Sequence, residues 1–282
     1  MTAYVLVHGS HSAGAFWAPI ARELGLRGHR VVAVDQPLHG AEVHLPLSYQ
    51  TQDPDALATE PTPLADVGLD DFERRVTQAV RRAAHAAPGG RVVLVGHSMG
   101  GLSVTRVANA VPELLEHLVY MSAVCFSPDL PSINDIMTAP EAATAVVPAE
   151  QVIGDPAKLG VLRLNFRSGD AKDLAVFKEM FCADYADVDF LRVLAGLQPD
   201  EAFRVNGDPS VGEVATWGRV PRTYLRFGKD RLIPLALQDR MIRTADERTP
   251  DNTFRVRSFP AAPHMGPLDT GPIVDALAGA GS

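Results

Sequence analysis

The sequence predicts an α/β fold in which a doubly wound, mostly parallel sheet carries an inserted helical cap. Short apolar runs bounded by turn residues alternate with helical patterns, which is expected when parallel strands are joined by helical crossovers. The strand signal then vanishes over a long stretch in the middle of the chain, from about 124 to 215. We therefore expect a sheet domain formed by residues 1–123 and 216–282, interrupted by a helical cap at residues 124–215.

Six short apolar runs are the expected strands of the sheet. Their length and composition favour buried parallel strands. They cover residues 4–7, 30–34, 92–95, 118–121, 223–227 and 254–259.

The clearest helix between these strands runs from Asp70 to Ala87. Apolar residues recur along it at helical spacing and form one face. These residues are Phe72, Val76, Ala79, Val80 and Ala83. The segment Pro88-Gly89-Gly90 follows and ends the helix, because proline and glycine are poorly compatible with its continuation.

Two further segments stand out between the strands. Within the expected cap, residues 171–183 and 187–197 have helical patterns separated by polar turns. The segment Ala41 to Leu69 contains four prolines, several acids and little periodicity, which predicts an irregular excursion. It either rims the substrate entrance or forms a solvated loop.

Composition restricts the class of protein. A chain of 282 residues with 46% hydrophobic content can bury a large core. The net charge of −8 leaves no basic excess, so we expect neither a nucleic acid nor an anionic membrane as a partner. Cys125 and Cys182 have no metal-ligand spacing and are expected to be buried thiols. Without a basic n-region or a membrane-spanning run, the chain is expected to be cytoplasmic, as a monomer or homodimer.

The segment Gly96-His97-Ser98-Met99-Gly100 indicates a catalytic serine. A β-branched run precedes it and a helix-compatible sequence follows, which is the context of a nucleophile elbow. A serine hydroxyl is a weak nucleophile unless a tight turn exposes it to a base. Gly96 and Gly100 allow the strand and the helix to approach closely around that turn.

An acid and a base follow the serine in the order found in enzymes with this elbow. Asp230 comes just after the expected strand 223–227, and His264 comes after the last expected strand. Side chains at the carboxyl ends of parallel strands gather at one edge of the sheet. Asp35 is a weaker candidate because it precedes the serine, and Asp269 is expected to cap or flank the last helix.

These residue types predict a division of roles. His264 takes the proton of Ser98, while Asp230 holds the imidazole in the required tautomer. The backbone N–H groups of Ser10 and Met99 are expected to bind the negative charge that forms on the substrate oxygen. His97 should project away from the serine hydroxyl and have a structural role.

Taken together, these segments resemble the α/β-hydrolase superfamily, and more narrowly the plant methyl esterase and hydroxynitrile lyase group with its bacterial esterase relatives. The resemblance covers the whole chain and is weakest in the cap. It rests on residues 6–9 with Phe16-Trp17, 96–101, 118–123, 220–224, 230–234 and His264-Met265.

The resemblance implies an α/β-hydrolase fold and an enzyme that needs no metal or organic cofactor. It carries the catalytic roles to Ser98, Asp230 and His264, and the oxyanion donors to Ser10 and Met99. Hydroxynitrile lyases of this group have a lysine directly after the catalytic histidine, whereas this chain has Met265, which favours ester hydrolysis. Ser10 does place a hydroxyl where the lyases have threonine, so the exclusion of a lyase is partial.

The expected substrate is a small, largely apolar carboxylic ester, including methyl esters and lactones. Such a substrate would suit an apolar pocket beneath the cap. Candidate lining residues are His11, Phe126, Met137, Phe166, Phe177, Phe181 and Met265, although each aromatic side chain could equally belong to the cap core. Two alternatives stay open: the same residues used for elimination, cyclisation or acyl transfer, and a small-ligand receptor with little turnover.

Overall fold

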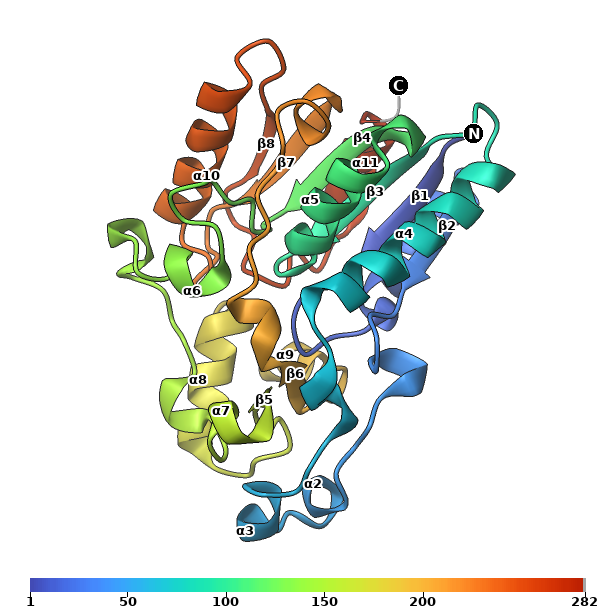
Figure 1. Cartoon of the computed structure of the whole chain (residues 1–282). Coiled ribbons are helices and arrows are strands. Elements are labelled where there is room, and N and C mark those ends of the chain that lie inside the picture. Colours follow the sequence, from blue (N-terminus) through green and yellow to red (C-terminus); the bar gives the residue numbers. More distant parts are fainter. Residues whose placement is uncertain (281–282) are drawn as a thin grey trace.

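A six-stranded parallel sheet forms the centre of the computed structural model, which describes residues 1–280 (Figure 1). The strand order is β2-β1-β3-β4-β7-β8, and every neighbouring pair is parallel. The strands are β1 (Ala3–Val7), β2 (Arg30–Val34), β3 (Val92–His97), β4 (Leu115–Met121), β7 (Arg222–Phe227) and β8 (Arg255–Phe259). All six predicted strands are therefore present.

Helices cover both faces of the sheet, as predicted for a doubly wound fold. One face packs against α4 (Leu69–Ala86), α5 (Gly100–Ala110) and α10 (Leu235–Arg248). The other face packs against α1 (Ala18–Leu26) and α11 (Gly271–Ala278). The predicted apolar face of α4 is confirmed, with Ala79 and Ala83 half-buried at its margin and Ala84 fully buried.

The two edge strands differ from the prediction. Only Val34 of β2 is buried, and no residue of β8 is. An edge strand has one hydrogen-bonded neighbour and incomplete cover from helices, so its apolar content does not enforce burial. The four inner strands are buried along nearly their whole length, as expected.

The chain between β4 and β7 forms the cap, which lies below the sheet in Figure 1. Its two predicted helices are confirmed as α8 (Ala171–Cys182) and α9 (Asp187–Ala195), and α6 (Ile133–Ile136) and α7 (Pro156–Leu159) add one turn each. The prediction that no strand occurs here is wrong. Strands β5 (Val161–Arg163) and β6 (Asp200–Ala202) pair antiparallel. Each has three residues, which is too short to show a strand period.

The excursion at residues 41–69 is packed against the cap by one buried ion pair. The Arg163 guanidinium binds both carboxylate oxygens of Asp200, at 2.6 and 2.8 Å, and is fully buried. It also donates to the backbone carbonyls of Leu57 and Glu60, at 2.6 and 2.8 Å. The excursion contains the short helices α2 (Leu47–Thr51) and α3 (Pro54–Leu57). It is therefore docked on the cap, which corrects the expectation of a solvated loop.

Short 3₁₀ helices connect many of these elements. They are η1 (Gly14–Trp17), η2 (Gly40–Glu42), η3 (Pro63–Asp66), η4 (Pro112–Leu114), η5 (Pro140–Ala142), η6 (Ala149–Gln151), η7 (Phe203–Asn206) and η8 (Trp217–Arg219). Cys125 and Cys182 are buried free thiols, as expected. Among residues 1–280, no helix is both long and apolar enough to cross a membrane.

Candidate active site

Ser98 lies on a strained turn between β3 and α5. Its φ of 55° is in the left-handed region, which is unfavourable for a residue with a side chain. The turn is tight because a Cβ atom on Gly96 would lie 2.8 Å from the backbone of Gly100. A Cβ atom on Gly100 would lie 2.7 Å from the backbone oxygens of Val7 and His8. Glycine at both positions is therefore required for the strand–turn–helix geometry that the sequence predicted.

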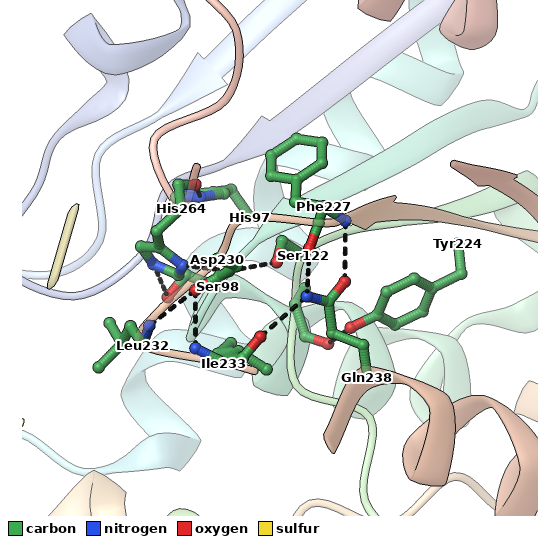
Figure 2. Close-up of polar contacts among 11 residues, drawn as sticks. His97, Ser98, Ser122, Tyr224, Phe227, Asp230, Leu232, Ile233, Gln238 and His264 are labelled. Carbon is green, nitrogen blue, oxygen red and sulfur yellow. Dashed lines mark hydrogen bonds and ion pairs between the residues drawn. The ribbon is translucent and has the colours of Figure 1, made fainter. Parts of the chain in front are cut away.

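Ser98, His264 and Asp230 form a continuous chain of hydrogen bonds (Figure 2). The Ser98 Oγ lies 3.0 Å from the His264 Nε2, and the His264 Nδ1 lies 2.6 Å from the Asp230 Oδ2. The three side chains follow β3, β8 and β7, and all are buried. The structure thus brings together the three residues that the sequence singled out.

The hydrogen-bond partners determine the tautomer of His264. An ionised carboxylate only accepts hydrogen bonds, so the Nδ1 of His264 carries the proton and donates to Asp230. The Nε2 then has a lone pair that accepts the hydrogen bond of the Ser98 hydroxyl. This arrangement would allow His264 to act as a base toward Ser98, with Asp230 orienting the imidazole.

The Asp230 carboxylate is held by further donors that the sequence analysis missed. The backbone N–H groups of Leu232 and Ile233 donate to its Oδ1, at 2.8 and 2.7 Å. The Ser122 hydroxyl donates to its Oδ2 at 2.5 Å. Ser122 directly follows β4, at the same sheet edge as the other site residues, and this position is the signal that could have revealed it.

Gln238 of α10 fixes the loop that carries Asp230. Its Oε1 accepts from the Phe227 N–H at 2.9 Å, and its Nε2 donates to the carbonyls of Phe227 and Ile233, at 2.9 and 2.8 Å. Figure 2 shows this amide bridging the two ends of the loop. The fully buried Gln238 side chain thus links the two ends of residues 227–233 and keeps the Asp230 carboxylate in position to bind His264.

The other polar candidates lie outside the hydrogen-bond chain of Ser98, His264 and Asp230. The His97 Nε2 donates to the backbone carbonyl of His264 at 2.8 Å, and its ring stacks on Phe16, so it supports the histidine loop. Asp35 accepts from the backbone of Gly14 at 2.7 Å and of Ala41 at 3.4 Å, which makes it a loop anchor. Asp269 accepts from the N–H of Gly271 and flanks α11, as expected.

Two backbone N–H groups near Ser98 are available to a substrate oxygen. Ser10 and Met99 line the same cavity as Ser98. Within residues 1–280, no protein acceptor takes the N–H of either residue. Unpaired N–H groups beside an activated serine are the chemical requirement for an oxyanion site.

A buried ion pair from the cap holds the loop that carries Ser10. The Glu201 Oε2 accepts from the backbone N–H of His11 at 2.8 Å and lies 3.3 Å from the His39 Nε2. Burial raises the pKa of Glu201, but His39 and the N–H of His11 outweigh it and bring the pKa to about 2. Burial lowers the pKa of His39, but Glu201 outweighs it and the net shift is upward. Sequence analysis had not identified either residue.

The site opens into an apolar cavity of about 340 Å³ between the sheet and the cap. Most of its wall is aliphatic or thioether, including Val124, Ile136, Leu164, Met180, Ile233 and Met241. Of the predicted lining residues, His11, Met137 and Phe181 are present in this wall. None of residues 41–69 belongs to it, so the excursion does not rim this cavity.

The other predicted lining residues point elsewhere. Phe126, Phe166 and Phe177 are not among the residues that line this cavity; Phe166 and Phe177 pack in the hydrophobic core of the cap, and Phe126 packs in the core of the sheet domain. Buried aromatic rings are used first to fill the space between packed elements. Met265 lines a second cavity of about 360 Å³ and a small void that also touches Ser98 and His264.

A family model described as "Alpha/beta hydrolase family" matches residues 4–276. The chain belongs to this family. The match covers the sheet domain, the cap and the three residues of the hydrogen-bond chain, so the resemblance seen in the sequence is confirmed.

Individual relatives are similar over most of the chain. A pyrethroid hydrolase of Sphingobium wenxiniae is 27% identical over 256 residues, covering 86% of this chain and 75% of the relative. Methylesterase 7 of Arabidopsis thaliana is 25% identical, covering 85% of this chain and 82% of the relative. A crystal structure of polyneuridine aldehyde esterase, a protein of Rauvolfia serpentina, superposes with a TM-score of 0.72. That match is 20% identical, covers 99% and 98% of the two chains, and supports the α/β-hydrolase fold.

Proposed function

We propose that this protein is a serine hydrolase that cleaves small, largely apolar carboxylic esters through Ser98, His264, Asp230 and an acyl-enzyme. The observation that carries the proposal is the unbroken hydrogen-bond chain from Asp230 to Ser98 on the wall of an apolar cavity. Relatives named pyrethroid hydrolase and methylesterase support ester hydrolysis. Methyl esters and lactones fit the proposed class.

The first half of the reaction forms the acyl-enzyme. The Ser98 Oγ attacks the carbonyl carbon of the ester while its proton passes to the Nε2 of His264. Negative charge develops on the carbonyl oxygen and is bound by the N–H groups of Ser10 and Met99. When this intermediate collapses, the alcohol leaves with the proton held by His264, and the acyl group stays on Ser98.

The second half restores the enzyme. Water attacks the acyl carbon and gives a proton to His264, and the same two N–H groups hold the oxygen charge again. Collapse releases the carboxylic acid, and His264 returns the proton to Ser98. Throughout both halves, the Asp230 carboxylate accepts the hydrogen bond of the His264 Nδ1–H and stabilises the imidazolium. The Ser122 hydroxyl and the backbone N–H groups of Leu232 and Ile233 hold this carboxylate in place.

The residue after His264 favours hydrolysis over lyase chemistry. Met265 has an uncharged thioether where lyases that resemble this chain have a lysine, so it supplies no cation to a leaving cyanide. Met265 lines the second cavity and the small void beside Ser98 and His264, and it is not among the residues that line the 340 Å³ cavity. Ester hydrolysis therefore accounts better than lyase chemistry for the groups that surround Ser98.

Labelling with a fluorophosphonate tests the proposal. The reagent phosphonylates an activated serine with loss of fluoride, and intact mass spectrometry counts the adducts. We expect one adduct on the wild-type protein and none on Ser98→Ala. Ser127→Ala is the matched control, because Ser127 is a buried serine that binds Asp129, and it should label like the wild type.

Ester hydrolysis is then measured for the same proteins and compared with their labelling. Ser98→Ala should abolish hydrolysis of short p-nitrophenyl esters and leave the thermal unfolding midpoint close to that of the wild type, because the hydroxyl contributes chemistry and little packing. An unlabelled wild-type protein, or a Ser98→Ala variant that keeps most of its esterase activity, contradicts the proposal.

A further inference from the structure

His11 leaves one buried ring nitrogen without a hydrogen bond. Its side chain is only 3% exposed. The Nδ1 lies 3.1 Å from the backbone carbonyl of Gln198, but no acceptor or donor among residues 1–280 reaches the Nε2. Buried polar atoms are paired in the great majority of cases, so an unpaired one next to a binding site indicates a missing ligand group.

The partner of Nδ1 determines what Nε2 can bind. A backbone carbonyl only accepts, so Nδ1 carries a proton and donates to Gln198. Burial lowers the pKa of His11, which keeps the ring neutral. In this tautomer, the Nε2 has a lone pair and no proton, so it can accept a hydrogen bond and cannot donate one.

The ring is held rigidly. The His11 backbone N–H donates to Glu201 at 2.8 Å, and the His11 carbonyl accepts from the Gln198 N–H at 2.7 Å. The ring also packs edge-on against Phe166, with centroids 5.3 Å apart. An acceptor fixed before binding loses little entropy when a ligand reaches it.

The ring belongs to the wall of the cavity that holds Ser98. Ser10, His11 and Ser98 line it together, and the remaining wall is mostly apolar. Glu201 also lines it, but both of its carboxylate oxygens are already bonded within the protein. A ligand that fills this apolar space would lie against His11, whose Nε2 is used by no group among residues 1–280.

We propose that the Nε2 of His11 accepts a hydrogen bond from a hydroxyl on the acyl group of the substrate. The preferred substrates are then hydroxylated, otherwise apolar esters, and His11 is a specificity-determining residue. This inference rests on the proposed function for its substrate class. A site with a buried acceptor discriminates against the ligand that lacks the hydroxyl, because that ligand leaves the acceptor desolvated and unpaired.

A matched set of esters tests the inference. Methyl 3-phenylpropanoate and its 2-, 3- and 4-hydroxyphenyl analogues differ only in the presence and place of one hydroxyl. We expect one isomer to have a kcat/KM about 10-fold or more above that of the parent ester, as hydrogen-bonding sites discriminate in other enzymes. A kcat/KM for all three isomers equal to or below that of the parent overturns the inference.

Two variants distinguish the roles of the two ring nitrogens of His11. His11→Asn keeps an N–H donor near the position of Nδ1, tolerates the left-handed φ of 55° and lacks the Nε2 acceptor, so the preference should vanish. His11→Gln places an amide oxygen near the position of Nε2 and should retain part of the preference. His85→Asn, which makes the same change at an exposed histidine of α4 outside the cavity, is the control and should keep the wild-type ratio. A preference that survives in His11→Asn overturns the inference.

Binding to Ser98→Ala separates this inference from the proposed function. Calorimetric titration with the preferred isomer and the parent needs no turnover, so the affinity ratio is measurable even if hydrolysis is absent. A ratio near one on this variant overturns the hydroxyl site. A ratio of about 10 without any turnover or labelling of the wild type keeps the site and contradicts the hydrolase.

Discussion

The hydroxyl of Ser122 and the Nδ1 of His264 meet the same oxygen of Asp230. The two contacts to its Oδ2 measure 2.5 and 2.6 Å, while its Oδ1 accepts two backbone N–H groups. One buried carboxylate therefore receives four hydrogen bonds, three of which do not involve His264. These three bonds hold the carboxylate in place whether or not His264 is protonated.

Replacing Asp230 by asparagine should remove most of the activity. The amide cannot stabilise the imidazolium and no longer enforces the Nδ1 proton, so we expect kcat to fall by about 10⁴-fold, as in a well-studied serine hydrolase triad. Steady-state kinetics on p-nitrophenyl butyrate measures the loss. Asp35→Asn is the control and should keep kcat within a few-fold, because the Asp35 carboxylate accepts hydrogen bonds from the backbone of Gly14 and Ala41 and is not part of the hydrogen-bond chain. If Asp35→Asn is inactive and Asp230→Asn is not, the acid has been assigned to the wrong residue.

Removing the Ser122 hydroxyl should reduce both stability and rate. A hydrogen bond to a charged group contributes about 1.5–3 kcal/mol, so the unfolding free energy of Ser122→Ala should fall by that order. Ser122 has a left-handed φ of 40°, which glycine adopts without strain. Ser122→Gly should therefore lose the same activity as Ser122→Ala and be more stable. Equal stability of the two variants in urea unfolding would show that backbone strain is absent.

The ion pair between Glu201 and His39 should make stability depend on pH. The raised pKa of His39 gives a contribution that is complete below its ordinary value of 6.5 and is lost as the pH rises through the raised value. The lowered pKa of Glu201 gives a contribution that is complete above 4.5 and is lost as the pH falls toward about 2. His8 does not substitute for His39, since burial and the nearby His39 lower its pKa to about 4.

Glu201→Gln should thus lower the unfolding midpoint most between about pH 5 and 6.5, and progressively less at alkaline pH. Thermal unfolding of the variant and the wild type across pH 5–9 measures the difference. His39→Gln should show the same pH dependence because it removes the other half of the pair. A difference that is constant over this range would mean that the two side chains are not paired as charges.

Enlarging Met137 should narrow the substrate range. Met137 is half-buried in the wall of the 340 Å³ cavity, and tryptophan at this position would occupy part of that space. We expect Met137→Trp to lower kcat/KM for p-nitrophenyl octanoate by about 10-fold relative to p-nitrophenyl acetate. Leu191→Trp, at an exposed residue of the cap, should leave the ratio unchanged. An unchanged ratio in Met137→Trp would place the acyl group outside this cavity.

Much of the sheet could be predicted from the sequence, and so could the grouping of Ser98, Asp230 and His264. Both depend on local patterns of residue types. Apolar runs with flanking turns mark the strands, and the carboxyl ends of parallel strands gather at one edge. Ser122 lies at such an end, yet a serine there has no sequence signature of its own. Gln238 was missed because its role depends on how α10 packs against the loop.

Features that depend on tertiary packing were predicted less well. The strands β5 and β6 have three residues each, so no period could reveal them. Phe166 and Phe177 are as apolar as a pocket wall requires, but their orientation into the cap core is decided by neighbours far apart in the sequence. The same holds for Glu201 and His39, whose pairing spans 162 positions of the chain.

The bond from Glu201 to the His11 backbone has a consequence for protein engineering and for divergence within the family. The cap of this protein is not an exchangeable module, because one of its side chains holds the loop beside Ser98. A chimera that takes its cap from a relative needs a carboxylate at this place and a histidine opposite it. Otherwise, the transplanted cap leaves that loop without its anchor. Recombination that moves the cap should succeed only where positions 39 and 201 are inherited together.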